Sequence, residues 1–383
     1  MKYIKYSFCG IFIFLLFFMF FTTINNNKKV SSLEKRNLQT FPKISFESIL
    51  NGTYMEDLTT AFSDQLEFRD YLVKGYFLFQ FQRYNGDVVI GDNNELYAAY
   101  QRVGDISKIK EDVKESTKLI NEVASGVDDA KFIFLSIPRK DAVEKENLPD
   151  SYISSSTVYE ESIKVIKENL SDDITLIDAY ELYNNDKLIN KNNRYYYMQD
   201  HHITPKGAEI LYKEILNMVN DERVTYYDLS NYEVGKTIIN GSFNNQIGQS
   251  VKPVLEELYI IPKFSLEYKR YEDERESDLK VYDKSNTYEY SYMKGDHAYT
   301  VVDTSRNDLP SILYVGSSFT NILEALSVPS FNKIVSIDYR HNTSGNGINY
   351  YIEKYDIDYV VFVPSQSNNA FSSSMIKTHL GLN

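Results

Sequence analysis

The chain has 383 residues, 41 Lys and Arg against 54 Asp and Glu, and a hydrophobic fraction of 43%, values that exclude a disordered chain and allow a sizeable core. The formal net charge is -13, which argues against nucleic-acid binding because clustered Lys and Arg supply most affinity for phosphates. The single cysteine, Cys9, excludes an internal disulfide and a cysteine-based zinc site.

The first apolar segment predicts a membrane-crossing helix. Residues 6–24 carry no charge and approach the roughly 20 apolar residues that span a bilayer. Lys2 and Lys5 precede this segment, so the positive-inside rule places the N-terminus in the cytoplasm and the bulk of the chain outside. No small-x-small cleavage signal follows, which favours a retained anchor over a removed signal peptide. We therefore expect a single-pass protein of the cell membrane with an extracytoplasmic body.

Composition and hydrophobic spacing divide the chain into five parts. Residues 1–29 are predicted to form the cytoplasmic tip and transmembrane signal-anchor, and the polar residues 30–50 a stalk. Residues 51–222 and 301–383 are the two parts of an α/β domain, and residues 223–300 a β-rich insertion between them.

Short apolar runs alternate with helical patterns in the two α/β parts. The runs predict buried strands, and this alternation is typical of a parallel sheet flanked by helices, an α/β sandwich. In the insertion, alternating stretches predict antiparallel strands. The predicted strands are 131–137, 174–177, 312–315 and 359–363 in the α/β parts and 257–261 and 288–292 in the insertion; the predicted helices are 54–79, 158–170 and 206–219.

The first candidate for chemistry is Asp200-His201-His202, which precedes a helix start at Thr204 and Pro205. An Asp two residues before a His can accept from Nδ1–H and leave Nε2 free as a base, so Asp200 and His202 suit these roles. His201 should point elsewhere, because adjacent side chains on an extended loop diverge. Loop hydrogen bonding and a metal site are the alternatives, although no histidine pair with the spacing of a metalloprotease helix is present.

The second candidate is the turn Gly316-Ser317-Ser318, where a predicted strand ends and a helical pattern begins at Phe319. Such a turn lifts a serine above the carboxyl edge of the sheet, near backbone N–H groups that can bind an oxyanion. Serine is a weak nucleophile until a histidine takes its proton, and His202 can supply that base. Helix capping is the alternative role for these serines.

With these motifs the sequence resembles the DHHW family, relatives of the AlgX/AlgJ-type alginate O-acetylation proteins with an SGNH-hydrolase-like domain. The signature is Asp200-His201-His202-Ile203, with Ile203 in place of the family's tryptophan. The resemblance extends over nearly the whole chain after the anchor. Further stretches that match are 34–38, 41–42, 64–69, 91–97, Ile137-Pro138-Arg139-Lys140, 337–340 and 355–360.

The resemblance implies a three-layer α/β/α SGNH-like domain in permuted motif order, since the Asp-x-His precedes the serine. It implies Ser318 as nucleophile, His202 as base and Asp200 as the residue that orients it. Gly316, Arg340 and His201 are the candidate oxyanion or substrate-binding residues, and the Ser318 amide is a further oxyanion candidate; for Arg340 a surface salt bridge is the alternative.

The leading functional hypothesis is a membrane-anchored O-acetyltransferase that modifies a cell-envelope or exported polysaccharide through an acetyl-serine. The resemblance implies a membrane-bound O-acyltransferase as acetyl donor, and no cofactor or metal is expected. A carbohydrate acetylesterase with the same triad and a non-catalytic glycan-binding scaffold are the alternatives.

Overall fold

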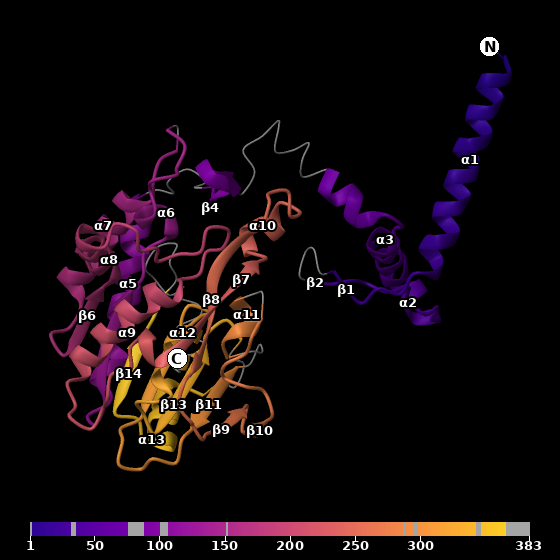
Figure 1. The fold of residues 1–383 in the computed structure, drawn as a ribbon. Helices are drawn as coiled ribbons and strands as arrows, with labels where there is room; N and C mark the ends of the chain where they lie inside the picture. Colours follow the sequence, from indigo (N-terminus) through magenta and orange to yellow (C-terminus); the bar gives the residue numbers. More distant parts are fainter. Residues whose placement is uncertain are drawn as a thin grey trace. The chain divides into compact units, whose positions relative to one another are not determined.

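The computed structural model of the chain describes residues 2–31, 36–75, 88–99, 106–150, 152–285, 288–293, 298–341 and 346–364. These residues form two compact units (Figure 1). Unit 1 is Met1–Val88 with Asn244–Lys252, and unit 2 is Val89–Phe243 with Pro253–Asn383.

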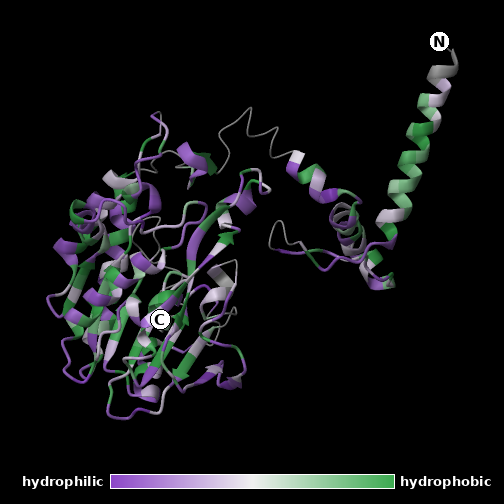
Figure 2. Cartoon of the chain, in the orientation of Figure 1, coloured by the Kyte–Doolittle hydropathy of each residue, from purple (hydrophilic) through white to green (hydrophobic). Residues whose placement is uncertain are grey.

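Unit 1 contains the apolar N-terminal helix and the short elements that follow it. In α1 (Lys2–Asn25) the stretch Tyr6–Asn25 is long and apolar enough to cross a membrane, and Figure 2 shows it as hydrophobic over most of its length. The segment predicted as a stalk contains regular structure: β1, β2 and α2. Its elements and the next helix are β1 (Val30–Ser31), β2 (Arg36–Asn37), α2 (Phe46–Leu50) and α3 (Thr53–Gln65).

The helix predicted over residues 54–79 is interrupted. α3 ends at Gln65, and helical structure resumes only at residues 69–75; residues 76–79 lie outside the described residues. Phe68 has a φ of 60°, which an α-helix does not accommodate. Gln65 is fully buried and donates to the carbonyls of Lys28 and Gln39. Its tertiary contacts at the helix end outweigh the continuous apolar spacing.

Unit 2 is built on a mixed eight-stranded sheet in the order β10-β9-β11-β13-β12-β14-β5-β6. The five strands from β13 to β6 are mutually parallel, and β11, β9 and β10 extend the sheet antiparallel. The four strands predicted in the α/β parts are confirmed. The strands are β5 (Lys131–Ser136), β6 (Ile174–Asp178), β9 (Lys269–Glu272), β10 (Arg275–Ser277), β11 (Tyr299–Asp303), β12 (Ile312–Gly316), β13 (Lys333–Asp338) and β14 (Tyr359–Phe362).

Helices cover both faces of this sheet, because its central strands are apolar on both sides. Along β5, Phe132 and Phe134 belong to one core, and Ile133 and Leu135 belong to the other, as the two-residue period of a strand requires. The first core includes α5 (Ile106–Ser125), α7 (Ser156–Asn169) and α13 (Ile348–Tyr355). The second includes α8 (Ala179–Ile189), α9 (Pro205–Val219) and α12 (Asn321–Ser327).

The segment 223–300 contributes to two sheets. β7 (Tyr232–Ile239) and β8 (Val254–Pro262) form a separate antiparallel pair, whereas β9 and β10 join the main sheet. The strand predicted at 288–292 is wrong, because α11 (Tyr288–Ser291) is helical there. Tyr288 and Tyr292 are both buried, and positions i and i+4 share a face in a helix as well as in a strand. Other short elements are β3 (Val88–Ile90), β4 (Leu96–Ala98), α6 (Lys140–Val143), α10 (Ser242–Gln246) and the 3-10 helices η1 (Asp92–Asn94) and η2 (Leu229–Asn231).

Candidate functional site

The serine turn lies at the carboxyl edge of the parallel strands. β12 ends at Gly316, and α12 begins at Asn321, two residues later than the apolar spacing predicts. A Cβ on Gly316 would lie 2.4 Å from Thr320 Cγ2 and 3.2 Å from Val363 Cβ. A larger residue at position 316 would therefore displace Thr320, in the turn that carries Ser318.

The Asp200 loop is closed by short-range contacts. Tyr196 and Ile203 form an isolated antiparallel bridge, and Thr204 caps α9 by accepting the Gly207 N–H, with Pro205 in the first turn. The predicted helix start is confirmed. The loop thus projects Asp200 and both histidines from the amino end of α9.

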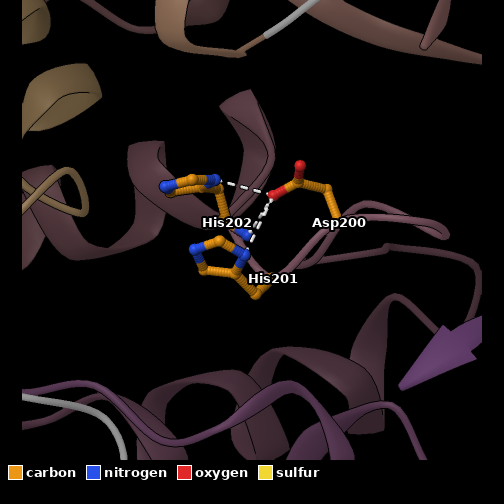
Figure 3. Close-up of side chains that lie close together, drawn as sticks. All are labelled: Asp200, His201 and His202. Carbon is orange, nitrogen blue, oxygen red and sulfur yellow. Dashed lines mark hydrogen bonds and ion pairs between the residues drawn. The ribbon is translucent and has the colours of Figure 1, made fainter. Parts of the chain in front are cut away.

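Asp200, His202 and Ser318 form one hydrogen-bonded chain. His202 Nδ1 lies 2.7 Å from Asp200 Oδ1, and His202 Nε2 lies 2.8 Å from Ser318 Oγ. Asp200 Oδ1 also accepts the backbone N–H of His202 at 2.9 Å. Figure 3 shows the carboxylate turned back toward both imidazoles. This is the geometry in which an imidazole can take a serine proton while a carboxylate fixes its tautomer.

Asp200 is held ionised by its surroundings. Burial by itself raises the pKa of this carboxyl, but the His202 and His201 imidazoles and hydrogen bonds from His202 and from the Ser242 N–H outweigh it. The net effect places the pKa well below its ordinary value. Asp200 therefore remains a hydrogen-bond acceptor for His202 throughout the neutral pH range.

His201 does not diverge from its neighbour as predicted. Its ring centroid lies 4.0 Å from that of His202, and its Nδ1 lies 2.7 Å from Ser242 Oγ. The carboxylate of Asp200 draws both rings to one side, with His201 Nδ1 3.6 Å from Oδ1. The ring is about one third exposed, so His201 is available at the rim of the site.

Residues 241 and 242 support the Asp200 loop, and nothing in the sequence pattern indicates this role. The Ser242 N–H donates to Asp200 Oδ2 at 2.6 Å, and the Phe243 N–H donates to the Gln199 carbonyl at 3.2 Å. A Cβ on Gly241 would lie 1.9 Å from that carbonyl oxygen. The glycine lets two backbone segments approach closely enough to make both hydrogen bonds.

A buried ionic group anchors the peptide of Met198, two residues before Asp200. Lys140, from the Ile-Pro-Arg-Lys stretch, donates to the Met198 carbonyl at 2.6 Å, and Glu256 accepts the Met198 N–H at 2.8 Å. Burial lowers the pKa of Lys140 to about 8, while attraction to Glu95, 3.2 Å away, opposes this shift. Lys140 and Glu256 thereby hold the two peptide groups on either side of the Met198 Cα in place.

The predicted oxyanion and substrate-binding residues Gly316 and Arg340 lie in different environments. Gly316 pairs with Asp338 inside the sheet, and Arg340 forms a two-point ion pair with Asp338, with Nε 2.9 Å from Oδ1. The part of the chain that the structure describes contains no acceptor for the Ser318 N–H. The Ser318 amide is thus the better oxyanion candidate, and the roles of Gly316 and Arg340 stay predictions.

Metal coordination competes with this arrangement for the same atoms. One ligand atom from each of Asp200, His201 and His202 lies within 4.8 Å of the others. However, His202 directs one nitrogen to Asp200 and the other to Ser318. Withdrawing either nitrogen for a metal would break the hydrogen-bonded chain, so the geometry favours serine chemistry.

The buried carboxyl of Glu324 is hydrogen-bonded to the turn that carries Ser318. Its Oε1 accepts from Ser336 Oγ at 2.6 Å and is hydrogen-bonded to Thr320 Oγ1, which also donates to the Ser317 carbonyl at 2.9 Å. Burial raises the pKa of Glu324 to about 7, although the hydrogen bonds from Ser336 and Thr320 lower it in part. A protonated Glu324 can donate to the threonine oxygen and complete this chain.

Replacing Glu324 by Gln should make folding less sensitive to pH. The folded carboxyl has a pKa of about 7 against an ordinary 4.5, so wild-type stability falls as pH rises through this window. The glutamine variant lacks this loss. Between pH 4.5 and pH 7.5, the difference in free energy of unfolding between the variant and wild type should therefore change by about 3 kcal/mol in favour of the variant. Urea unfolding of both proteins at pH 4.5 and 7.5 measures the difference; parallel pH dependences would contradict the prediction.

This chain is similar in fold to solved structures of other proteins. A DHHW family protein from Eubacterium siraeum matches with a TM-score of 0.59 and 18% identity, over 77% of this chain and 99% of the other. Bacillus cereus PatB1 with a sulfonyl adduct matches with a TM-score of 0.60 and 19% identity, over 76% and 99%. The chain has the DHHW-protein fold. The resemblance predicted from the sequence is confirmed for the fold.

The O-acetyltransferase domain of Pseudomonas putida AlgJ matches the DHHW-type fold of this chain with a TM-score of 0.46 and 14% identity, over 77% and 99%. No protein-family model and no curated protein sequence matches the chain.

Proposed function

We propose that this chain is an extracytoplasmic, membrane-anchored O-acetyltransferase that acetylates a cell-envelope or exported polysaccharide through an acetyl-Ser318 intermediate. The observation that carries the proposal is the 2.8 Å contact between His202 Nε2 and Ser318 Oγ, continued by the 2.7 Å contact to Asp200. The position of Ser318 at the carboxyl edge of β12 and the permuted order of the motifs support an SGNH-like serine enzyme. The apolar helix α1 supports the anchor.

The proposed reaction has two halves with the same groups. Ser318 Oγ attacks the acetyl carbonyl of the donor while His202 Nε2 takes its proton; the donor C–O bond then breaks, and the leaving oxygen receives that proton. In the second half a sugar hydroxyl attacks acetyl-Ser318, His202 takes the hydroxyl proton, and Ser318 Oγ recovers it. The Ser318 N–H would stabilise the oxyanion of both tetrahedral intermediates.

The proposed partners follow from the compartment. Acetyl-CoA is cytoplasmic, whereas the site lies outside under the proposed topology, so the donor is a membrane-bound O-acyltransferase that passes acetyl groups across the membrane. The acceptor is a polysaccharide. On the protein side, the proposed steps use only side-chain and backbone groups of this chain, and the proposal includes no cofactor or metal.

Covalent labelling tests the proposal. The full chain in detergent is mixed with phenylmethylsulfonyl fluoride or with p-nitrophenyl acetate, and its intact mass is measured. We expect one sulfonyl or acetyl adduct in wild type and in Ser317→Ala, and none in Ser318→Ala or His202→Ala. The PatB1 structure with a sulfonyl adduct makes the first reagent a fitting probe. An adduct retained by Ser318→Ala would contradict the proposal.

The fate of the acetyl group separates the alternatives. Transfer to an added oligosaccharide supports the transferase. Release of acetate with no transfer, even to several acceptors, would indicate an esterase. Glycan binding without any adduct would indicate a non-catalytic scaffold.

A further inference from the structure

We propose that Tyr288 is a positioning residue that holds the base and the nucleophile together. The inference rests on the proposed serine chemistry. It goes further by assigning a role to the segment predicted as an insertion, which lies outside both motifs of the site.

Tyr288 contacts both partners of the proposed proton transfer. Its ring is stacked on His202, with centroids 3.9 Å apart and planes within 10°. Its hydroxyl donates to the backbone carbonyl of Ser318 at 2.9 Å. The side chain is 3% exposed. One rigid side chain therefore spans from the face of the imidazole to the peptide that carries the nucleophile.

The imidazole needs this second constraint. The hydrogen bond from Nδ1 to Asp200 fixes one atom of the His202 ring, but the ring can still tilt about that contact. A parallel ring at van der Waals distance opposes such tilting, which would move Nε2 away from Ser318 Oγ. The adjacent Ile203 is fully buried and pairs with Tyr196, and its aliphatic side chain has no ring to stack on the imidazole.

The stack also favours the charge that the reaction creates. When His202 takes the Ser318 proton it becomes a cation, and the face of an aromatic ring attracts a cation within about 6 Å. Burial raises the pKa of Tyr288 well above its ordinary value. The phenol therefore stays neutral, and its O–H remains available to the Ser318 carbonyl.

Tyr288 is itself fixed by other aromatic rings. Tyr292, one helical turn later, lies 5.5 Å away between centroids, and Tyr197 lies at 6.3 Å in an edge-on arrangement. The Tyr292 and Tyr197 hydroxyls both donate to the Leu258 carbonyl of β8. The β7/β8 pair is thus connected to the site through this aromatic group.

The test separates the ring from the hydroxyl in the full-length protein. Tyr288→Phe keeps the stack and loses the hydrogen bond, so sulfonylation by phenylmethylsulfonyl fluoride should slow by about 5-fold. Tyr288→Leu loses both and should slow by about 100-fold. Proton NMR should show the deshielded His202 Nδ1–H signal in wild type and Tyr288→Phe, and its loss by exchange in Tyr288→Leu.

A matched control is Tyr314→Phe. Tyr314 is fully buried on β12, and its hydroxyl lies 2.8 Å from Ser327 Oγ. This variant should lose similar stability to Tyr288→Phe and keep the wild-type labelling rate. Wild-type labelling by both Tyr288 variants would overturn the inference. If Tyr288→Leu does not fold, an unchanged rate in Tyr288→Phe overturns it.

The experiment also distinguishes an error in this inference from an error in the proposed function. If wild type itself is not labelled, the serine chemistry is wrong, and the Nδ1–H signal alone then decides the role of Tyr288. Loss of that signal in Tyr288→Leu supports positioning, and its retention contradicts it.

Discussion

Replacing Asp200 by Asn should slow acylation of Ser318 by about 10⁴-fold, the effect of the same substitution in a serine protease triad. Both oxygens of Asp200 accept hydrogen bonds: Oδ1 from His202 and Oδ2 from the Ser242 N–H. An amide offers only one acceptor atom, so its NH2 group must face one of these donors. If it faces the ring, His202 adopts the other tautomer and Nε2 carries the proton.

The rate of p-nitrophenol release from p-nitrophenyl acetate, measured with purified full chain, tests this prediction. Asp178→Asn is the matched control, because Asp178 is also a hydrogen-bonded carboxylate, which caps α8 through the Tyr180 N–H. The control should retain the wild-type rate. A loss of less than 10-fold in Asp200→Asn would show that the carboxylate does not orient the base.

Replacing Gly241 by Ala should disrupt the site without changing any group that reacts. The new Cβ would lie 1.9 Å from the Gln199 carbonyl oxygen and 3.0 Å from the Asp200 nitrogen. These are backbone atoms, so relief requires the two segments to separate by about 1 Å or more. We expect a rate loss of about 100-fold and destabilisation of roughly 1–3 kcal/mol.

Gly126→Ala is the control, because a Cβ at Gly126 has its nearest neighbour at 3.5 Å, an ordinary contact distance. The same ester assay gives the rate, and urea unfolding gives the stability. A Gly241→Ala variant with wild-type activity and stability would contradict the close approach of these segments. Weakened Asp200 support should also appear as loss of the His202 Nδ1–H signal.

Local sequence determined the parts of the molecule whose interactions are short in range. The strands β5, β6, β12 and β14 follow from short apolar runs in the sequence. β5, β12 and β14 are buried along nearly all of their length, whereas β6 lies at the edge of the sheet and exposes Thr175. The start of α9 follows from the chemistry of Thr204 and Pro205. The Asp200 contact to His202 spans two residues, so backbone geometry alone nearly sets it.

Tertiary structure decided the contacts that join distant segments. His202 and Ser318 are 116 residues apart, and their 2.8 Å contact depends on the order of the parallel strands and on the placement of α9. Sequence motifs predicted both residues as site residues, whereas no local pattern indicates a role for Gly241, Ser242 or Tyr288. Their roles arise from close approach of a separate segment, which leaves no periodic signature.

Tertiary contacts also explain where the structure differs from the sequence predictions. The helix predicted through residue 79 is interrupted at Phe68 because contacts of Gln65 with Lys28 and Gln39 outweigh local spacing. Tyr288 and Tyr292 fit a strand or a helical turn equally well, and packing selects the helix. His201 turns toward His202 because both imidazoles interact with one buried carboxylate. The spacing of apolar residues predicts which side chains are buried. Which side chains they pack against depends on the tertiary structure.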